Sequence, residues 1–337
     1  MLLASSWLFS CDSQATSPSD ENNEPVDVFE QNKLLYRCVN LGNALEAPTE
    51  GEWGVTLQHE YFELIRDAGF TGVRIPIRWS AHAAVDSPYT ISKSFLSRVD
   101  WAVNLAEQND LAAIINIHHY EEIMTEPEAH KERFLGLWRQ IASHFQNRPS
   151  SIFFEVLNEP NDKLTAEIWN DYLAAAIDLI RQTNKNRTII IGTAEWGHLN
   201  ALNKLVLPED DQNIIVTFHY YNPFHFTHQG AEWVSNSDQW LGTTWNGTAS
   251  EKKAVDQDFE SAVIWAAQHN RPLFMGEFGA YRKADMPSRY AWTSYVARAA
   301  EKRNISWAYW EFCSGFGIYD SSTKKWNSLL NALIPEE

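Results

Sequence analysis

Short apolar stretches recur eight times along the chain, and most are followed by a longer stretch with helical periodicity. The apolar stretches cover residues 37–41, 72–77, 112–117, 152–154, 188–191, 214–218, 273–275 and 306–309. Continuous apolar runs of this length are typical of strands that a parallel sheet buries on both faces. Helical periodicity predicts helices near 57–68, 93–108, 128–145, 166–182, 254–269, 287–302 and 327–333. The alternation predicts a single-domain (β/α)8, or TIM, barrel over residues 29–337, without an internal linker.

Polar and aromatic side chains follow at least six of these predicted strands. In a (β/α)8 barrel the carboxyl ends of all eight strands meet at one mouth, where active sites form. The predicted fold therefore gathers a candidate set at that mouth: Asn43, Glu46, Arg74, His118, His119, Asn158, Glu159, Trp196, His219, Tyr221, Glu277 and Trp310. This convergence carries more weight than any single motif.

Two carboxylates in this set stand out because they follow strands on roughly opposite walls. Glu159 follows the fourth strand in Asn158-Glu159-Pro160, and Glu277 follows the seventh in Gly276-Glu277-Phe278. Glycoside hydrolysis needs such a pair, one to protonate the leaving oxygen and one to attack the anomeric carbon. A separation of ~5 Å predicts retention of configuration, and ~6.5–9.5 Å predicts inversion. Taken singly, each glutamate is more often a structural, salt-bridged acid; the pair at matching strand ends favours catalysis.

Three neighbours have side chains suited to support such a pair. Arg74 lies within apolar Val73-Arg74-Ile75, where a permanently charged guanidinium needs an anionic partner, and the attacking carboxylate is the best candidate. Asn158 is expected to donate to a sugar 2-hydroxyl, and Tyr221 to hydrogen-bond the attacking carboxylate. A structural ion pair for Arg74 and a turn-forming role for Asn158 remain the alternatives.

Histidines at the mouth raise the question of a metal. His118 and His119 end the third strand, and His219 ends the sixth. Their spacing matches neither an HxH nor an HExxH zinc arrangement, and imidazoles are equally suited to bind sugar hydroxyls. We therefore predict no metal and no organic cofactor, with a metal-dependent hydrolase as the minor alternative.

Aromatic residues supply candidate stacking surfaces. Trp196 and Trp310 end strands five and eight, although a tryptophan is more often a core residue than a platform. The long insert 222–250 carries Phe224, His228 and Trp233, and a loop beyond ~15 residues in a compact domain is usually functional. We expect it to wall one side of a groove; the alternative is a surface loop with its own aromatic cluster.

Composition favours a neutral ligand. The chain has 27 Lys and Arg against 44 Asp and Glu, a formal charge of −17, which disfavours nucleic acid because such binding depends on neutralised phosphates. Fifteen Trp and 13% aromatic residues are compatible with stacking on sugar rings as well as with core packing.

The N-terminus departs from a globular composition. Residues 1–10 are apolar and Leu8-Phe9-Ser10-Cys11 resembles the end of a bacterial lipoprotein signal, but basic residues before it are missing, so an upstream start and a chance match both remain open. Residues 13–27 are rich in Ser, Asp, Glu, Asn and Pro, as in a disordered tether. We divide the chain into segment 1–28 and catalytic domain 29–337. We expect an extracytoplasmic monomer that is either secreted or tethered to a membrane through lipidated Cys11. Cys38 and Cys313 are expected to be buried free thiols rather than a disulfide.

Several motifs together resemble one known family. They are Asn40-Leu41-Gly42-Asn43-Ala44-Leu45-Glu46, Asn116-Ile117-His118-His119-Tyr120, Asn158-Glu159-Pro160, His219-Tyr220-Tyr221-Asn222-Pro223-Phe224, Glu277-Phe278-Gly279 and Trp307-Ala308-Tyr309-Trp310-Glu311-Phe312-Cys313-Ser314-Gly315-Phe316-Gly317. Over residues 29–333 the chain resembles glycoside hydrolase family 5, and within it subfamily 25.

The resemblance implies roles residue by residue. Glu159 matches the acid/base and Glu277 the nucleophile of a retaining endo-β-1,4-glucanase. The positions that match hydrogen-bonding or cleft-lining residues are Arg74, His118, Asn158, His219, Tyr221, Asn43, Glu46, His119, Trp196, Phe224, His228, Trp233 and Trp310. The implied partner is a β-glucan or mannan polysaccharide. An endo-β-1,4-mannanase and a non-catalytic glycan-binding barrel remain the alternatives.

Overall fold

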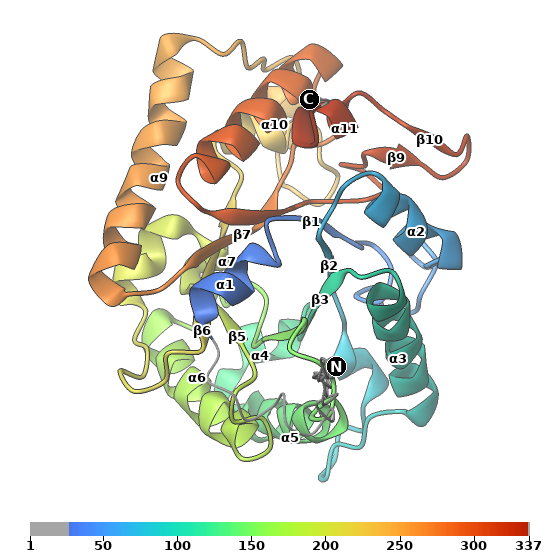
Figure 1. Cartoon of the computed structure of the whole chain (residues 1–337), viewed down its shortest axis with the longest axis vertical. Coiled ribbons are helices and arrows are strands. Elements are labelled where there is room, and N and C mark those ends of the chain that lie inside the picture. Colours follow the sequence, from blue (N-terminus) through green and yellow to red (C-terminus); the bar gives the residue numbers. More distant parts are fainter. Residues whose placement is uncertain (1–26, 336–337) are drawn as a thin grey trace, which may run out of the picture.

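Eight parallel strands close into a barrel in the computed structural model, which describes residues 27–335 (Figure 1). Each strand pairs with the next in chain order, and β8 pairs with β1, so the sheet has no free edge. The strands are β1 (Arg37–Asn40), β2 (Gly72–Ile75), β3 (Ala112–Asn116), β4 (Ile152–Glu155), β5 (Ile189–Gly192), β6 (Ile214–Tyr220), β7 (Leu273–Phe278) and β8 (Ser306–Tyr309). The predicted barrel is confirmed.

Helices surround the barrel and lie close to their predicted positions (Figure 1). They are α2 (His59–Asp67), α3 (Lys93–Gln108), α5 (Pro127–His144), α6 (Ala166–Arg181), α9 (Ala249–His269), α10 (Met286–Glu301) and α11 (Leu329–Leu333). Short elements fill the connections: α4 (Glu121–Thr125), α7 (Ala194–Gly197), α8 (Phe224–Thr227) and the 3-10 turns 79–82, 199–204 and 237–240. Between β5 and β6 there is only α7 and a 3-10 turn, so the strict alternation of strand and long helix is interrupted there.

Side chains inside the barrel form an apolar layer below a polar layer. Toward the amino ends of the strands the interior is filled by apolar residues, among them Ile114, Phe153 and Ile215. On β4, buried Glu155 lies two residues beyond Phe153 and on the same inner face, and its carboxylate binds buried Arg74 of β2. The strands are therefore not apolar throughout their inner face, and the polar layer forms the floor of the mouth.

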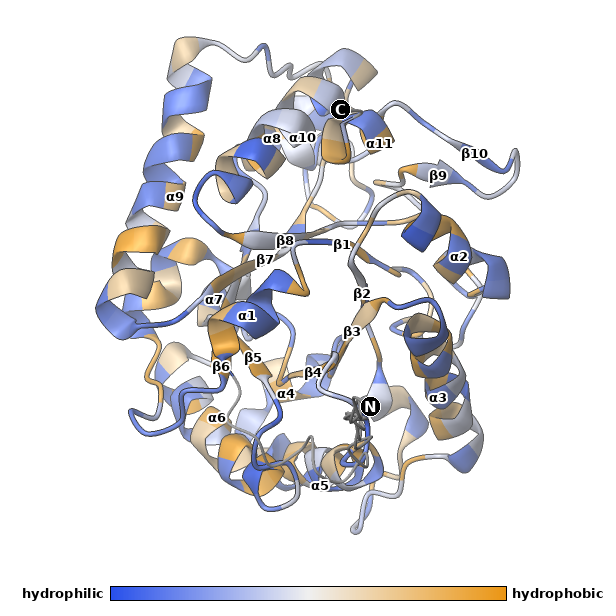
Figure 2. Cartoon of the chain, viewed as in Figure 1, coloured by the Kyte–Doolittle hydropathy of each residue, from blue (hydrophilic) through white to orange (hydrophobic). Residues whose placement is uncertain are grey.

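A second apolar layer lies between the sheet and the helices, and it contains most of the buried aromatic and aliphatic residues. Along the ribbon the helices alternate between hydrophilic and hydrophobic residues, as expected when one face packs on the barrel and the other meets solvent (Figure 2). This continuous packing fixes the strand ends from which the site residues project.

Helix α1 (Val28–Lys33) covers the amino end of the barrel, opposite the mouth. Asp27 caps it, with its Oδ1 accepting from the Phe29 amide at 2.9 Å. The Asn32 side chain donates to the Leu273 carbonyl at 3.1 Å and closes the interior apolar layer together with Val28 and Leu35. Helix α1 thus begins at Val28, the last residue of the predicted segment 1–28, while Cys11 and the rest of residues 1–26 lie outside the described residues.

Cys38 and Cys313 are free thiols, as predicted. Cys38 is buried, whereas Cys313 is only partly buried, contrary to the expectation that both would be. Strands β9 (Tyr319–Asp320) and β10 (Lys325–Trp326) add a small antiparallel hairpin after β8. Within residues 27–335, helices long and apolar enough to cross a membrane are absent.

Candidate active site

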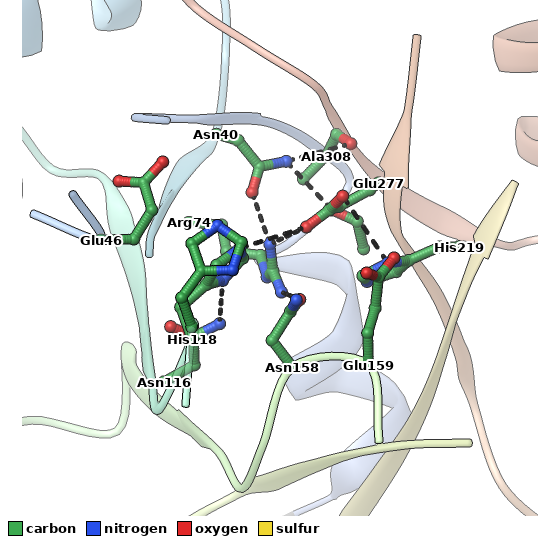
Figure 3. A network of polar contacts seen from close by, with 12 residues as sticks. Asn40, Glu46, Arg74, Asn116, His118, Asn158, Glu159, His219, Glu277 and Ala308 are labelled. Atoms are coloured by element: carbon green, nitrogen blue, oxygen red, sulfur yellow. Dashed lines mark hydrogen bonds and ion pairs between the residues drawn. The ribbon is translucent and has the colours of Figure 1, made fainter. Parts of the chain in front are cut away.

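The two predicted carboxylates face each other at the mouth of the barrel (Figure 3). Glu159 lies just beyond β4 with a φ of 46°, and Glu277 lies within β7. One oxygen of each, together with a ring nitrogen of His219, lie within 4.8 Å of one another. The His219 Nδ1 is 2.7 Å from Glu159 Oε1 and 3.6 Å from Glu277 Oε2. The spacing agrees with ~5 Å for a carboxylate pair that retains anomeric configuration, and is too short for inversion at ~6.5–9.5 Å.

Arg74 lies beneath this pair and is fully buried. Its Nη1 donates to Glu277 Oε1 at 2.7 Å, which agrees with the predicted partner. Its Nε and Nη2 donate to both oxygens of Glu155 at 2.6 and 2.7 Å, and Nη2 also donates to Asn158 Oδ1 at 2.7 Å. The carboxylates raise the pKa of Arg74 against the opposing effect of burial, so the guanidinium is a permanent cation at the base of the site.

Glu277 is nine-tenths or more buried and is held on both oxygens. Arg74 donates to Oε1, and the Tyr221 hydroxyl donates to Oε2 at 2.9 Å, as the sequence predicted. Burial raises the pKa of Glu277, and the positive charges of His219 and Arg74 oppose that rise. Two charge-assisted hydrogen bonds favour the carboxylate form that a nucleophile needs.

The buried histidines of the site differ in their electrostatic surroundings. Burial lowers the pKa of His219, but the charges of Glu277 and Glu159 outweigh it, so the net pKa is raised. The pKa of His118 is lowered well below its ordinary value, chiefly by burial. The Asn116 side chain hydrogen-bonds His118 Nδ1 at 3.0 Å, and the His118 ring lies parallel to Trp310 with centroids 5.7 Å apart. His118 is thus a neutral, oriented group, while His219 favours the charged form.

A cavity of ≈ 680 Å³ opens above these groups. Its lining residues are Asn43, Glu46, Trp53, His118, His119, Asn158, Glu159, Tyr221, His228, Trp233, Glu277, Tyr281, Arg282, Trp310, Ser314, Gly315 and Phe316. A cavity of this size that mixes aromatic faces with a few polar groups is typical of a site for a small organic ligand or part of a polymer.

Most of the predicted site residues reach this cavity, but four do not line it. Arg74 and His219 lie beneath the wall and act through the carboxylates they contact. Trp196 and Phe224 stand outside it, with 60% and 43% of their surface exposed. Their exposed rings are available only to a ligand that extends beyond the cavity.

Glu46 lines the cavity, but its hydrogen-bond partners are backbone amides of its own loop. It is fully buried, and its carboxylate accepts from the Asn43 amide and from the Ala44 amide at 2.9 Å. Burial raises the pKa of Glu46 to about 7. Its described bonds fix the loop after β1, a structural role that is separate from the expected contact with a ligand.

The insert after β6 is ordered, and part of it walls the cavity. It contains α8 and a 3-10 turn, and Trp245 is buried. Trp233 reaches the cavity and packs edge-on against Tyr281, with ring centroids 4.9 Å apart. Phe224 stacks on His228 with centroids 4.1 Å apart. Both readings of the insert therefore hold in part: it forms a wall and has its own aromatic cluster.

Sequence reasoning missed several residues of the site. Glu155 directly follows the predicted strand 152–154 and was assigned no role, although it supplies the bidentate partner of Arg74. Trp53, Tyr281 and Phe316 line the cavity from loops. A charged residue at the end of an apolar strand was the available signal at Glu155. Phe316 lies in the family motif that follows strand eight, whereas Trp53 and Tyr281 had no signal.

A (β/α)8 barrel whose mouth carries two carboxylates at this spacing has the architecture and geometry of the retaining glycosidases. Comparison with known families agrees with that class. The chain belongs to glycosyl hydrolase family 5, whose cellulase model matches residues 22–315.

Among curated relatives, endoglucanase H of Acetivibrio thermocellus is 35% identical over 326 residues, covering 95% of this chain and 35% of the relative. The cellulase/esterase CelE of the same organism is 30% identical, with 91% of this chain and 38% of the relative covered. The chain thus spans little more than a third of the length of these two relatives.

Two similar solved structures are matched over nearly their whole length. Endoglucanase Cel5A from Thermotoga maritima has 56% identity and a TM-score of 0.90, covering 91% of this chain and 100% of that one. Structures of that enzyme include complexes with mannotriose and with cellobiose. The cellulose synthase subunit Z of Clostridioides difficile has 42% identity and a TM-score of 0.86, covering 88% and 99%.

Proposed function

We propose that the protein is a retaining endo-β-1,4-glucanase. The single observation that carries the proposal is the placement of Glu159 and Glu277 oxygens within 4.8 Å of each other at the mouth of the barrel. The family assignment and the endoglucanase relatives support glucan as the substrate class.

The geometry suits a double displacement in which the two carboxyl groups have different roles. Glu159 protonates the glycosidic oxygen as Glu277 attacks the anomeric carbon, which forms a glycosyl ester and releases the aglycone. Glu159 then removes a proton from water, and the resulting hydroxide releases the sugar with its original configuration. His219 orients Glu159 at 2.7 Å, while Arg74 and Tyr221 hold Glu277 for attack.

Substitution Glu277→Gly tests the nucleophile. Hydrolysis should fall to background, because no carboxylate remains to form the ester, and added formate or a glycosyl fluoride of inverted configuration should restore turnover. Glu209→Gly, at an exposed loop position, is the matched control and should retain wild-type rates. Wild-type-like turnover by Glu277→Gly without formate contradicts the assignment.

Mannan is the second candidate substrate, because the similar Thermotoga maritima enzyme has been solved with mannotriose. The axial 2-hydroxyl of a mannosyl unit must fit beside Asn158 and His118, which line the cavity. Values of kcat/KM on cello- and manno-oligosaccharides of equal length, with the product anomer followed by NMR, rank the two substrates.

Two rival classes are separated by simple measurements. A non-catalytic glycan-binding barrel releases no reducing ends from soluble glucan. A metal-dependent hydrolase using Glu159, His219 and Glu277, whose ligand atoms are close enough to share an ion, loses activity in chelator. The proposed mechanism predicts release of reducing ends at an unchanged rate after dialysis against chelator.

We also propose that the protein acts outside the cytoplasm as a monomer, anchored through a lipidated Cys11. The apolar residues before Cys11 and the polar segment after it support this proposal. Mass spectrometry of the native N-terminus should show a diacylglyceryl modification on Cys11, and an unmodified N-terminus contradicts the anchor. Light scattering of the protein without residues 1–26 measures the oligomeric state.

A further inference from the structure

Glu311 is a buried carboxylate that the catalytic scheme does not use. It directly follows Trp310 at the end of β8 and is fully buried. We infer that Glu311 is a positioning residue: its carboxylate anchors the loop 311–317 and so holds Trp310 and Phe316 in the substrate cleft. This inference rests on the proposed glucanase function and adds a specific determinant of substrate binding to it.

The carboxylate of Glu311 is surrounded by backbone amides of its own loop. Oε2 accepts from the Cys313 amide at 2.7 Å and from the Ser314 amide at 2.8 Å. Oε1 accepts from the Ser314 amide at 2.9 Å and from the Phe316 amide at 3.0 Å. Three backbone amides thus donate to one side chain. This arrangement requires both side-chain oxygens to be hydrogen-bond acceptors.

The charge of Glu311 has no cationic partner. Within residues 27–335, Lys, Arg and His nitrogens are all beyond ion-pair distance of this carboxylate. Its titratable neighbours are Glu46 on the β1 loop, Cys313 on its own loop and Tyr309 on β8. Burial raises the pKa of Glu311 to about 7 against the lowering effect of the amides. A group that is expensive to bury and lacks a counter-ion is retained here for the loop it organises.

Loop 311–317 forms a cleft wall and is tightly packed on its neighbours. Trp310, Ser314, Gly315 and Phe316 all line the cavity. A β-carbon at Gly315 would stand 2.4 Å from the Tyr281 ring, and one at Gly279 would stand 2.2 Å from the Trp310 carbonyl. The loop therefore cannot shift without moving the rings that face the substrate.

The anchor is also joined to the neighbouring strand β1. The Phe312 amide donates to the Asn40 carbonyl at 3.0 Å, which ties loop 311–317 to β1. A β-carbon at Gly42 would stand 3.1 Å from the Trp310 ring and 3.2 Å from Glu311 Cβ. The Trp310 ring lies parallel to His118. Releasing the Glu311 anchor would therefore displace the Trp310 ring, which forms part of the cavity wall.

Two substitutions separate an anchoring acceptor from a space-filling side chain. Glu311→Gln keeps the shape but places an NH₂ group against backbone N–H donors, whereas Glu311→Asp is smaller and keeps two acceptor oxygens. An anchor predicts that Asp is tolerated better than Gln; a purely space-filling role predicts the reverse. Glu301→Gln, which removes partly buried ion pairs with Arg37 and Arg298 at the far end of the barrel, controls for a general loss of stability.

The experiment measures kcat and KM on cellotetraose for the wild type and the three variants. Because the wall binds sugar rings before and during reaction, Glu311→Gln should raise KM about tenfold with kcat nearly unchanged. Glu311→Asp should give an intermediate KM, and Glu301→Gln a wild-type KM. A KM within twofold of wild type in Glu311→Gln, or a higher KM in Asp than in Gln, overturns the inference.

The Glu311→Asp variant keeps the inference testable if Glu311→Gln does not fold. If Glu311→Gln is insoluble, Glu311→Asp decides alone, and a KM within twofold of wild type overturns the anchor. Wild-type protein that does not cleave cellotetraose contradicts the proposed function instead, so the two failures are distinguishable.

Discussion

Arg74 connects the two halves of the site, because one guanidinium contacts the predicted nucleophile and two further strand-end residues. Its bonds to Glu155, Glu277 and Asn158 lie between 2.6 and 2.7 Å. A buried cation between two carboxylates leaves one net negative charge, which the Tyr221 hydroxyl and His219 help to offset. The position of Glu277 therefore depends on how the other hydrogen-bonding partners of Arg74 hold its guanidinium in place.

Glu155→Gln tests whether the Glu155 carboxylate holds Arg74 in place. With one carboxylate lost, Arg74 should be less well held, and kcat/KM should fall about tenfold while the free energy of unfolding falls by about 3 kcal/mol. Steady-state kinetics and urea unfolding measure the two effects. Glu107→Gln removes a partly exposed ion pair with Arg148 and should change neither quantity by much. Unaltered kinetics in Glu155→Gln would show that Arg74 holds Glu277 without help.

His219 predicts a pH dependence with a definite sign. Its folded pKa is raised above the ordinary value of 6.5, so its protonation stabilises the fold. That stabilisation is fully present below 6.5 and is lost as the pH rises through the folded value. His219→Asn should therefore lower the free energy of unfolding more at pH 6 than at pH 9, as measured in urea.

For His118, the contribution to the free energy of unfolding should change with pH in the opposite direction. Its folded pKa is lowered well below 6.5, so its contribution is present above 6.5 and is lost as the pH falls. His118→Asn should thus be more damaging at pH 9 than at pH 6. Equal pH slopes in the two variants would contradict the charge states assigned to these rings.

At the scale of elements, α1 closes the amino end of the barrel and separates its interior from solvent. Leu35 follows this helix and is fully buried in the interior layer, whereas the adjacent Leu34 is 41% exposed. The two residues provide a matched pair of the same chemical type at consecutive positions.

Leu35→Ala should therefore destabilise the protein far more than Leu34→Ala. Burial predicts a loss of about 2–5 kcal/mol in the free energy of unfolding at Leu35 and less than about 1 kcal/mol at Leu34. Chemical denaturation measures both, and kcat should stay near wild type because α1 lies opposite the mouth. Equal losses would mean that α1 does not close the barrel in solution.

At the scale of the whole molecule, the net charge of −17 acts on charged substrates at a distance. Arg282 is the one Arg or Lys among the residues that line the cavity, so local attraction of an anionic polymer is limited. On carboxymethylcellulose, kcat/KM should rise when salt is raised from about 10 to 150 mM, because screening weakens long-range repulsion. Neutral cellotetraose should show no such rise, and a fall on the charged polymer would contradict the expectation.

Strand-end placement explains why much of the site was predictable. Residues at or just beyond the carboxyl ends of the parallel strands, such as Glu159, Glu277 and Tyr221, come together whenever the barrel closes. Glu155 escaped because its role depends on side chains that project inward from other strands. Trp53 and Phe316 escaped because loops between elements carry no periodic signal.

The order of strands and helices, and with it the barrel and the shared mouth, follows from the sequence alone, because the spacing of apolar residues reflects which face of each element is buried. The tertiary structure decided which polar residues meet: the Arg74–Glu155 pair, the amides gathered on Glu311, and the rings that reach the cavity. Those contacts join residues far apart in the chain or depend on the path of a loop, and no local periodicity encodes either.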